Sequence, residues 1–273
     1  MSEAGQGAEA RPMREDSDLQ TAPWRAPRGK VRVVLPAYNE ARDVGPLLEA
    51  IDQAMVDDQL DYAVLVVDDG SVDGTLAEVE RRAAFIPVEV LQHASNRGLG
   101  ETIRDGLRAA AAACGERDII VVMDADNTHL PGLIRAMTRR IQEGADVVIG
   151  SRFRAGADVR GVPLHRRWLS RGASWMLRVV FPIRGVRDYT CGYRAYRAPV
   201  LVEAFERYGE EFINEDGFQC MVDILLKLRS LDVIFAEVPL ILRYDQKGGA
   251  SKMRVWSTVV NTLSLMARRR IGR

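Results

Sequence analysis

Cysteine is scarce in this chain, which has only three in 273 residues, at Cys114, Cys191 and Cys220. They are odd in number and far apart, so they form neither a disulfide framework nor a zinc-binding pattern. Because disulfides mark oxidising compartments, their absence favours a reducing one, and we expect a cytoplasmic protein.

Long apolar runs are also lacking. A transmembrane helix needs about 20 consecutive apolar residues, and no stretch of this sequence reaches that length. Residues 1–30 are polar, rich in Gly, Ala, Pro and charge, and contain no signal-peptide core. We predict a disordered tail over residues 1–30 and a protein that is soluble or bound at the cytoplasmic face of a membrane.

An excess of charge of one sign is missing as well. The 38 basic and 38 acidic residues balance to a formal net charge of zero. This balance gives no general reason to expect nucleic acid as a partner. The hydrophobic content of 47% allows a sizeable core, and the length suits one large domain or two small ones.

Short apolar stretches alternate with stretches of helical spacing over the first half of the chain. Short apolar runs predict buried strands, and a period of 3.6 residues predicts helices. Strands are predicted over residues 31–35, 62–67, 88–91, 119–123 and 146–149, and helices over 41–56, 75–85, 101–113 and 133–143. This alternation implies an α/β fold with a mostly parallel sheet.

Four polar or glycine-bearing loops follow the predicted strands. They cover residues 37–40, 68–74, 96–100 and 124–129. Ligands of open α/β sheets bind at the carboxyl ends of the strands, so we expect these loops to meet at one crevice.

Asp124 and Asp126 stand directly after the apolar run of residues 119–123. Two carboxylates at a strand end cannot be buried unpaired, because desolvating a charge costs too much. They therefore face a cation or a cleft, and oxygen ligands of this kind suit Mg²⁺ or Mn²⁺ carrying a diphosphate. A surface loop with two solvated aspartates is the alternative that this pair alone leaves open.

A second acidic stretch, DDGSVDGT, begins at Asp68, where a predicted strand becomes a helix. Ser71 or Asp73 would cap that helix. Capping does not explain Asp68 and Asp69, because carboxylates at a strand end also accept hydrogen bonds from a base or a ribose. The loop that begins Asn96-Arg97-Gly98 offers a cation and a flexible backbone to a diphosphate, and an ordinary turn is the other interpretation.

Nine sequence blocks occur in order between residues 31 and 253. They are VVLPAYNE (33–40), VVDDGSVDGT (66–75), NRGLG (96–100), VMDADNTH (122–129), VIGSRF (148–153), RRWLSRGASW (166–175), DYTCGYRAYR (188–197), GFQ (217–219) and EVPL (237–240). The first four resemble family 2 glycosyltransferases with a GT-A fold. The later ones resemble dolichyl-phosphate mannose synthases and bacterial polyprenyl-phosphate glycosyltransferases.

The resemblance implies a metal-dependent, inverting transfer of a hexose from a nucleotide diphosphate sugar to a polyprenyl phosphate. It favours GDP-mannose as donor, with UDP-glucose next, and Mg²⁺ or Mn²⁺ as the cofactor, held by Asp124 and Asp126. Relatives often carry Gln where this chain has Thr128, which leaves the third metal ligand open. The residues that it assigns to the donor are Pro36, Tyr38, Glu40, Asp68, Asp69, Asn96, Arg97, Asp124, Ala125 and Asp126.

The later blocks supply residues for the acceptor. The resemblance implies that Arg152 faces the acceptor phosphate and acts in catalysis together with Asp126. Arg166 and Arg167 are further candidates, with solvated helix charges as the alternative. The residues that match blocks around the sugar and the acceptor are Asp188, Thr190, Gly192, Arg194 and Lys252.

The chemistry of the acceptor agrees with this assignment. A polyprenyl phosphate is already an anion, so it needs cations that position it and no strong general base. Arginine suits this part because its fork bonds phosphate oxygens at two points. Residues 152–197 mix many arginines with Trp168, Trp175 and Phe181, which suits a phosphate head at a membrane surface.

Asp216 leaves a rival function open. In many inverting relatives an aspartate in such an acidic pair is the general base for a hydroxyl acceptor, and Asp216, or less readily Glu215, would play that part here. A helix N-terminal cap is the structural alternative. A rival of another class is a non-catalytic sugar-nucleotide-binding regulator, against which the intact pair of Asp124 and Asp126 argues.

The C-terminal residues 254–273 are predicted to form a basic amphipathic helix after a glycosyltransferase domain over residues 31–253. An apolar stretch of about three turns precedes Arg268-Arg269-Arg270, as in helices that lie in the plane of a membrane. A helix packed on the domain fits equally well. The expected partners are therefore the sugar nucleotide, a lipid phosphate, and a membrane surface or membrane protein.

Overall fold

The computed structural model describes residues 29–162 and 164–244, without the side chains of residues 164–169 and 218. The predicted tail, Lys252 and the predicted C-terminal helix therefore lie outside the described residues, apart from the last two residues of the tail. Those parts of the sequence analysis remain predictions.

Strands and helices alternate in the first half of the described chain, as the sequence predicts. The strands are β1 (Val31–Ala37), β2 (Tyr62–Asp68), β3 (Val88–Gln92), β4 (Ile119–Val122) and β5 (Val147–Ser151). The helices are α1 (Val44–Asp57), α2 (Thr75–Ala83), α3 (Leu99–Ala113) and α4 (Leu133–Gln142). Their ends differ from the predicted ones by a few residues, because the apolar period is clearest in the middle of an element.

The second half contains elements that periodicity did not reveal. They are β6 (Asp158–Arg160), α5 (Leu164–Val180), β7 (Arg194–Arg197), α6 (Ala198–Tyr208), α7 (Cys220–Leu228), β8 (Phe235–Pro239) and β9 (Ile241–Arg243), with short 3-10 turns at Gly209–Phe212, Gly217–Gln219 and Arg229–Leu231. Strands of three or four residues are too short to show an alternating pattern.

The main sheet has the order β3-β2-β1-β4-β7-β5-β8 among the described strands. All neighbours are parallel except β7, which runs antiparallel to both β4 and β5. The chain moves from β1 outward to β2 and β3, then returns to place β4 on the other side of β1. This reversal makes the gap between β1 and β4 a topological switch point, where open α/β sheets bind ligands.

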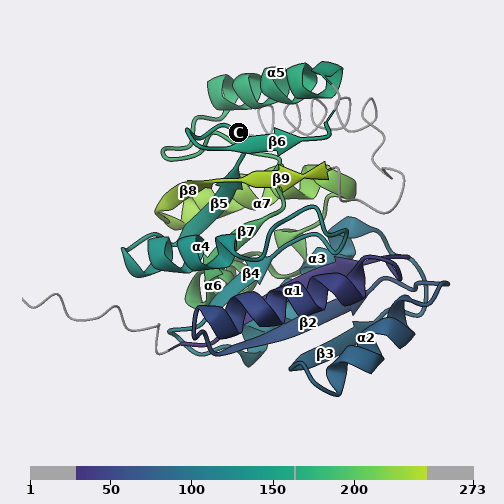
Figure 1. Cartoon of the computed structure of the whole chain (residues 1–273). Helices are drawn as coiled ribbons and strands as arrows, with labels where there is room; N and C mark the ends of the chain where they lie inside the picture. Colours follow the sequence, from purple (N-terminus) through teal and green to yellow (C-terminus); the bar gives the residue numbers. More distant parts are fainter. Residues whose placement is uncertain (1–28, 163, 245–273) are drawn as a thin grey trace, which may run out of the picture.

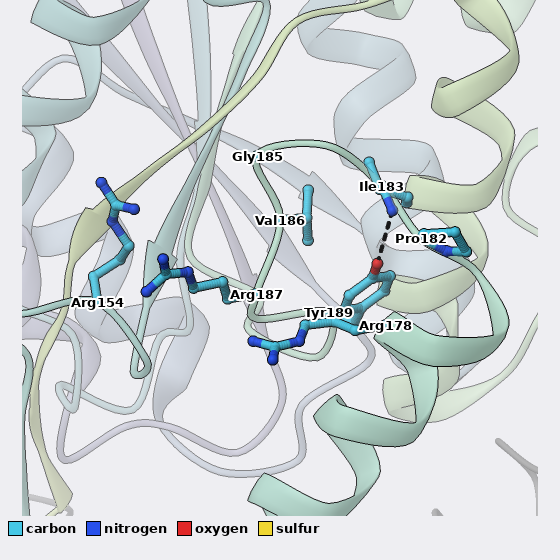
Figure 2. A pocket seen from close by; sticks show the side chains of 8 residues that line it. All are labelled: Arg154, Arg178, Pro182, Ile183, Gly185, Val186, Arg187 and Tyr189. Carbon is cyan, nitrogen blue, oxygen red and sulfur yellow. Dashed lines mark hydrogen bonds between the residues drawn. The ribbon is translucent and has the colours of Figure 1, made fainter.

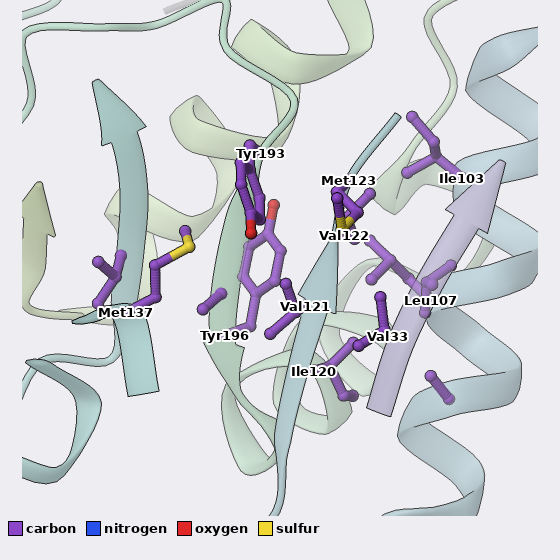
Figure 3. Close-up of a cluster of buried hydrophobic side chains, with 14 of the residues drawn as sticks. Val33, Ile103, Leu107, Ile120, Val121, Val122, Met123, Met137, Tyr193 and Tyr196 are labelled. Carbon is purple, nitrogen blue, oxygen red and sulfur yellow. The ribbon is translucent and has the colours of Figure 1, made fainter. Parts of the chain in front are cut away.

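Helices cover both faces of this sheet (Figure 1), with α1 and α2 in contact on one face and α3, α6 and α7 on the other. Val33 in β1 and Ile120 in β4 are fully buried, as are Ile103 and Leu107 of α3, which pack near them (Figure 3). This apolar interior holds the strand ends rigidly, so the loops that follow them are held in fixed positions.

Candidate active site

The loops after β1 and β2 are joined by hydrogen bonds. Asn39 donates its main-chain N–H to Ser71 Oγ over 2.9 Å, and Glu40 donates to Thr75 Oγ1 over 2.8 Å. The N-cap of α2 is Gly74, without a side-chain cap bond, so neither Ser71 nor Asp73 takes the predicted cap position. Asp73 accepts from the main chain of Thr75, and Ser71 bonds the neighbouring loop. The two loops are thus held together at the carboxyl ends of β1 and β2, where Tyr38 and Glu40 are half-buried.

Asp68 ends β2 with a carboxylate that is only partly satisfied. Its residue is 1% exposed, and its Oδ1 accepts from the main-chain N–H of Ser71 over 3.2 Å. Its Oδ2 is buried and has no hydrogen-bond partner among the described residues. A buried acceptor left open in this way is ready for a donor from a ligand, because unsatisfied polar groups cost free energy.

Asp69 has a different place from its neighbour. Its Oδ1 accepts from Arg97 N and lies 2.8 Å from His93 Nδ1, and its Oδ2 accepts from Gly98 N over 2.9 Å. These bonds hold the 96–98 loop against the end of β2. The structure therefore gives Asp69 a supporting part, and it does not open its oxygens to the crevice.

Arg97 is likewise turned away from the place that the sequence suggested. Its guanidinium pairs with Asp105, at 2.9 Å, and with Glu101, both on α3. Glu101 and Asp105 lie in the first two turns of α3, close to Arg97. They therefore compete with any diphosphate for the Arg97 guanidinium. Asn96 is exposed on this loop.

The predicted metal pair directly follows β4. Asp124 is partly exposed, Ala125 between them is buried, and Asp126 is half-buried. Thr128 donates to Asp126 Oδ1 through its hydroxyl over 2.6 Å and through its main chain over 3.2 Å. Thr128 is 3% exposed, and its hydroxyl orients Asp126.

His129 supports the other member of the pair. Its Nδ1 accepts from the main-chain N–H of Asp124 over 3.3 Å, which leaves the proton of a neutral ring on Nε2. That Nε2 lies 3.9 Å from Asp124 Oδ2, and the ring stacks on Tyr193 with centroids 4.9 Å apart. His129 thereby fixes the main chain of Asp124, and its ring lies beside the Asp124 carboxylate.

The donor set fits a hard divalent cation. Within residues 29–162 and 164–244, no cluster of three His, Cys, Asp or Glu side chains is arranged to hold a metal. Asp124 and Asp126 supply carboxylate oxygens alone, which is the chemistry of Mg²⁺ and Mn²⁺ sites that use one or two carboxylates and complete the shell with water and substrate phosphate.

The antiparallel strand β7 brings a third group of residues to this edge. Because β7 runs opposite to β4 and β5, the segment before it, 188–193, lies beside the segments that follow them. Arg152, just after β5, bonds Asp188 at two points, Nε to Oδ2 at 2.7 Å and Nη2 to Oδ1 at 2.6 Å. Its Nη2 also donates to Thr190 Oγ1 over 2.6 Å, and its Nη1 forms no bond with the described residues.

The charges of this pair reinforce each other. Burial raises the pKa of Asp188, but the charge and hydrogen bonds of Arg152 lower it more, so the net pKa lies below its ordinary value. Burial lowers the pKa of Arg152. The negative charge of Asp188, with a smaller contribution from Asp124, outweighs burial and raises this pKa above its ordinary value. Both groups are therefore ionised, and Arg152 lies within the electrostatic reach of Asp124.

Gly192 lies just before β7, and Arg194 is the first residue of that strand. A Cβ on Gly192 would lie 3.4 Å from Asp124 Oδ1, so the main chain of Gly192 passes directly beside this carboxylate. Arg194 is fully buried and donates to the main-chain oxygens of Tyr189, Cys191 and Met221 over 2.8 Å each. It holds the turn in shape from within the core and has no surface toward a substrate.

Asp216 lies on a neighbouring segment. Its side chain is exposed, and the preceding main-chain oxygen of Glu215 packs against α3, where a Cβ on Gly100 would approach it to 2.3 Å. The buried side chain of Lys227 holds the chain just before Asp216 in place. It is 6% exposed, bonds Asp223 over 2.6 Å, and donates to the main-chain oxygens of Glu211 and Phe212.

Supporting residues such as Lys227, His93 and Glu237 were not predicted from the sequence. Glu237 Oε1 accepts from the main-chain N–H groups of Arg187 and Asp188 over 2.6 and 2.8 Å and so holds the turn that presents Asp188. Glu237 belongs to the block EVPL, which was noted only for its resemblance to known proteins. No local sequence pattern shows that a carboxylate is buried and bonds a turn about 50 residues away.

The fold and site together define the class as a nucleotide-diphospho-sugar transferase of the GT-A type. The particular family follows from comparison with known proteins. The model of glycosyl transferase family 2 matches residues 32–205, and the chain belongs to this family.

Two relatives illustrate the match. A dolichol-phosphate mannosyltransferase of Pyrococcus furiosus is 35% identical over 211 residues, which is 77% of this chain and 55% of that protein. A polyprenol monophosphomannose synthase of Mycolicibacterium smegmatis is 31% identical over 233 residues, 83% of this chain and 82% of that one. The chain thus spans little more than half the length of the archaeal relative.

Solved structures share the fold. Glucosyl-3-phosphoglycerate synthase from Mycobacterium tuberculosis, in complex with Mn²⁺, UDP-glucose and phosphoglyceric acid, superposes with a TM-score of 0.63 at 19% identity. The match covers 90% of this chain and 80% of that one. Among the described residues, no helix is both long and apolar enough to cross a membrane.

Proposed function

We propose that this glycosyltransferase moves mannose, with inversion, from a nucleotide diphosphate sugar to a polyprenyl phosphate. The observation that carries the proposal is the position of Arg152, which is paired to Asp188 and Thr190 and lies within electrostatic reach of Asp124. A cation beside a metal site suits an acceptor that is itself a phosphate. The names of the two relatives, which concern mannosyl transfer to dolichol and polyprenol phosphates, support the same acceptor class.

The chain's own residues divide the work. Asp124 and Asp126 would hold Mg²⁺ or Mn²⁺, which when bound neutralises the charge of the leaving diphosphate. Thr128 and His129 keep these carboxylates in place, and rigid positioning of this kind preserves catalytic geometry. Asp68, through its open Oδ2, would accept a hydrogen bond from the base or ribose of the donor.

Arg152 would position the acceptor. Its Nε and Nη2 are used by Asp188 and Thr190, so the guanidinium is locked in one orientation with Nη1 left for a phosphate oxygen. A phosphate acceptor needs no proton removed, so the site requires a fixed cation and no general base. GDP-mannose is the first donor to test, and UDP-glucose the second.

A partition assay tests this proposal. The purified protein is incubated with labelled nucleotide sugars, Mg²⁺ or Mn²⁺ and a polyprenyl phosphate, and the label is separated between organic and aqueous phases. Organic label that requires both lipid phosphate and metal supports the proposal. Metal-dependent hydrolysis of the donor without organic label would move the acceptor to a hydroxyl compound, and no turnover of any donor would favour a binding protein.

A further inference from the structure

Many arginines of the described residues are paired with acids. Those in ion pairs include Arg32, Arg81, Arg82, Arg97, Arg104, Arg108, Arg135, Arg139, Arg140, Arg160 and Arg197. Arg154, Arg178 and Arg187 pair with no acid within the described residues, and the same holds for Arg117, Arg184 and Arg229. Arg154, Arg178 and Arg187 line one pocket of about 550 Å³.

The three guanidinium groups come from separate segments. Arg154 follows β5, Arg178 is on the last turn of α5, and Arg187 precedes the turn to β7. Figure 2 shows them along one side of the pocket, with the apolar side chains of Val186 and Ile183 on the other. No acidic residue lines the pocket, so three like charges are gathered there without a counterion from the described chain.

The remaining polar group of the pocket is already satisfied. The hydroxyl of Tyr189 donates to Phe181 O over 2.7 Å and accepts from Ile183 N over 3.2 Å. The pocket therefore offers guanidinium donors and an apolar wall, but few acceptors. This combination disfavours a sugar, which needs both donors and acceptors, and favours a phosphate, which arginine bonds through its planar fork.

The surface beside the pocket indicates where that phosphate comes from. Trp175 and Val179, one turn apart on α5, are 63% and 62% exposed. The sequence of α5 contains no acidic residue. Tryptophan concentrates at the boundary between lipid and water, and basic residues beside it are attracted to anionic headgroups.

We infer that the pocket of Arg154, Arg178 and Arg187 binds the phosphate of an anionic phospholipid headgroup, with Trp175 and Val179 entering the lipid boundary. Arg154 is two residues from Arg152, and Arg187 is next to Asp188. Docking here therefore sets the Arg152–Asp188 pair at the bilayer surface. This membrane contact is separate from the donor and acceptor sites and goes beyond the proposed transfer.

Vesicle sedimentation tests the inference without donor or acceptor, so its result is independent of transfer activity. The full chain is mixed with vesicles of neutral phosphatidylcholine, or of phosphatidylcholine with phosphatidylglycerol. The variant Arg178→Gln/Arg187→Gln is compared with Arg117→Gln/Arg139→Gln, which removes the same charge from two exposed arginines on segments that do not line the pocket. Circular dichroism confirms that both variants fold.

The wild-type protein is expected to bind the anionic vesicles and not the neutral ones. The pocket variant should lose roughly 25-fold in affinity, about fivefold for each arginine near an anionic surface, and the control variant much less. Equal losses of affinity in the two variants would show that only the total surface charge matters, and this would overturn the inference. Binding of inorganic phosphate in the pocket without vesicle binding would overturn the lipid assignment.

Discussion

The side chains of Arg152 and Asp188 form a two-point ion pair, although 36 residues separate them in the sequence. Asp188 is fully buried, and the Arg152 side chain is 23% exposed. Main-chain N–H groups of Arg152, Thr190 and Cys191 also point at the Asp188 carboxylate. The pair thereby joins the end of β5 to the turn before β7 and fixes the only described arginine that we assign to the acceptor.

Removal of one partner should destabilise the fold strongly. Asp188→Asn leaves the Arg152 charge largely buried without its counterion, which typically costs about 3–5 kcal/mol in unfolding free energy. Urea denaturation measures this loss. Asp158→Asn, which breaks the exposed pair with Arg160, should cost about 1 kcal/mol or less. Similar small losses in both variants would show that the buried pair contributes little.

The same pair predicts how stability depends on pH. Arg152 outweighs burial and holds the pKa of Asp188 below its ordinary value. Ionised Asp188 therefore stabilises the fold above its unfolded-state pKa of about 3.9, and this contribution is lost as the pH falls through the lower folded-state value. The wild-type protein should lose more unfolding free energy between pH 5 and pH 2.5 than Asp188→Asn, whereas parallel profiles would contradict the assignment.

Asp126→Ala should abolish transfer while the fold survives. The change removes half of the proposed metal pair, and a metal commonly supplies several kcal/mol of stabilisation to a developing charge, so a loss of roughly 10³-fold or more in kcat is expected. Metal-dependent turnover and binding of Mn²⁺ are measured together. Asp61→Ala, on an exposed residue before β2, serves as the control, and unchanged turnover in Asp126→Ala would refute the site.

Thr128→Val should weaken the metal site without removing a ligand. The hydroxyl of Thr128 orients Asp126, and groups that orient metal ligands typically contribute roughly 10- to 100-fold in affinity or activity. Titration of activity with Mn²⁺ should show a raised half-saturating concentration. Thr128→Ser keeps the hydroxyl and should restore the wild-type curve, and equal effects of both changes would point to packing in place of the hydrogen bond.

Asp216→Asn separates the two acceptor classes. A general base for a hydroxyl acceptor contributes roughly 10²–10⁴-fold, whereas a phosphate acceptor brings no proton that must be removed. With a polyprenyl phosphate we expect a loss below about tenfold, similar to that of Glu215→Gln. A loss above 10²-fold, with no change in KM, would favour the hydroxyl-acceptor function.

The order of strands and helices over residues 31–151 was predictable from the sequence. Apolar runs and helical spacing are local, so they marked β1 to β5 and α1 to α4 to within a few residues. The carboxylates of Asp124 and Asp126 were predictable for the same reason, since they directly follow a buried strand. Resemblance to known blocks then indicated the family, which the comparison confirmed.

What the site residues contact was decided by tertiary structure. Asp68 and Asp69 are adjacent in sequence, yet one keeps an open oxygen and the other holds the 96–98 loop. Arg97 pairs with acids on α3 and is not turned to the crevice. These contacts depend on which groups lie within hydrogen-bond distance in the folded chain. The periodic pattern of apolar residues in the sequence does not reveal those distances.

The sequence by itself determined the α/β architecture and the acidic strand ends, because burial of apolar surface follows a local pattern. Tertiary structure alone decided that β7 enters the sheet antiparallel and carries Asp188 to Arg152. It also decided that Arg154, Arg178 and Arg187 share one pocket. Charges far apart in the chain acquire a common ligand only when the sheet order brings their segments together, because electrostatic attraction depends on distance in space.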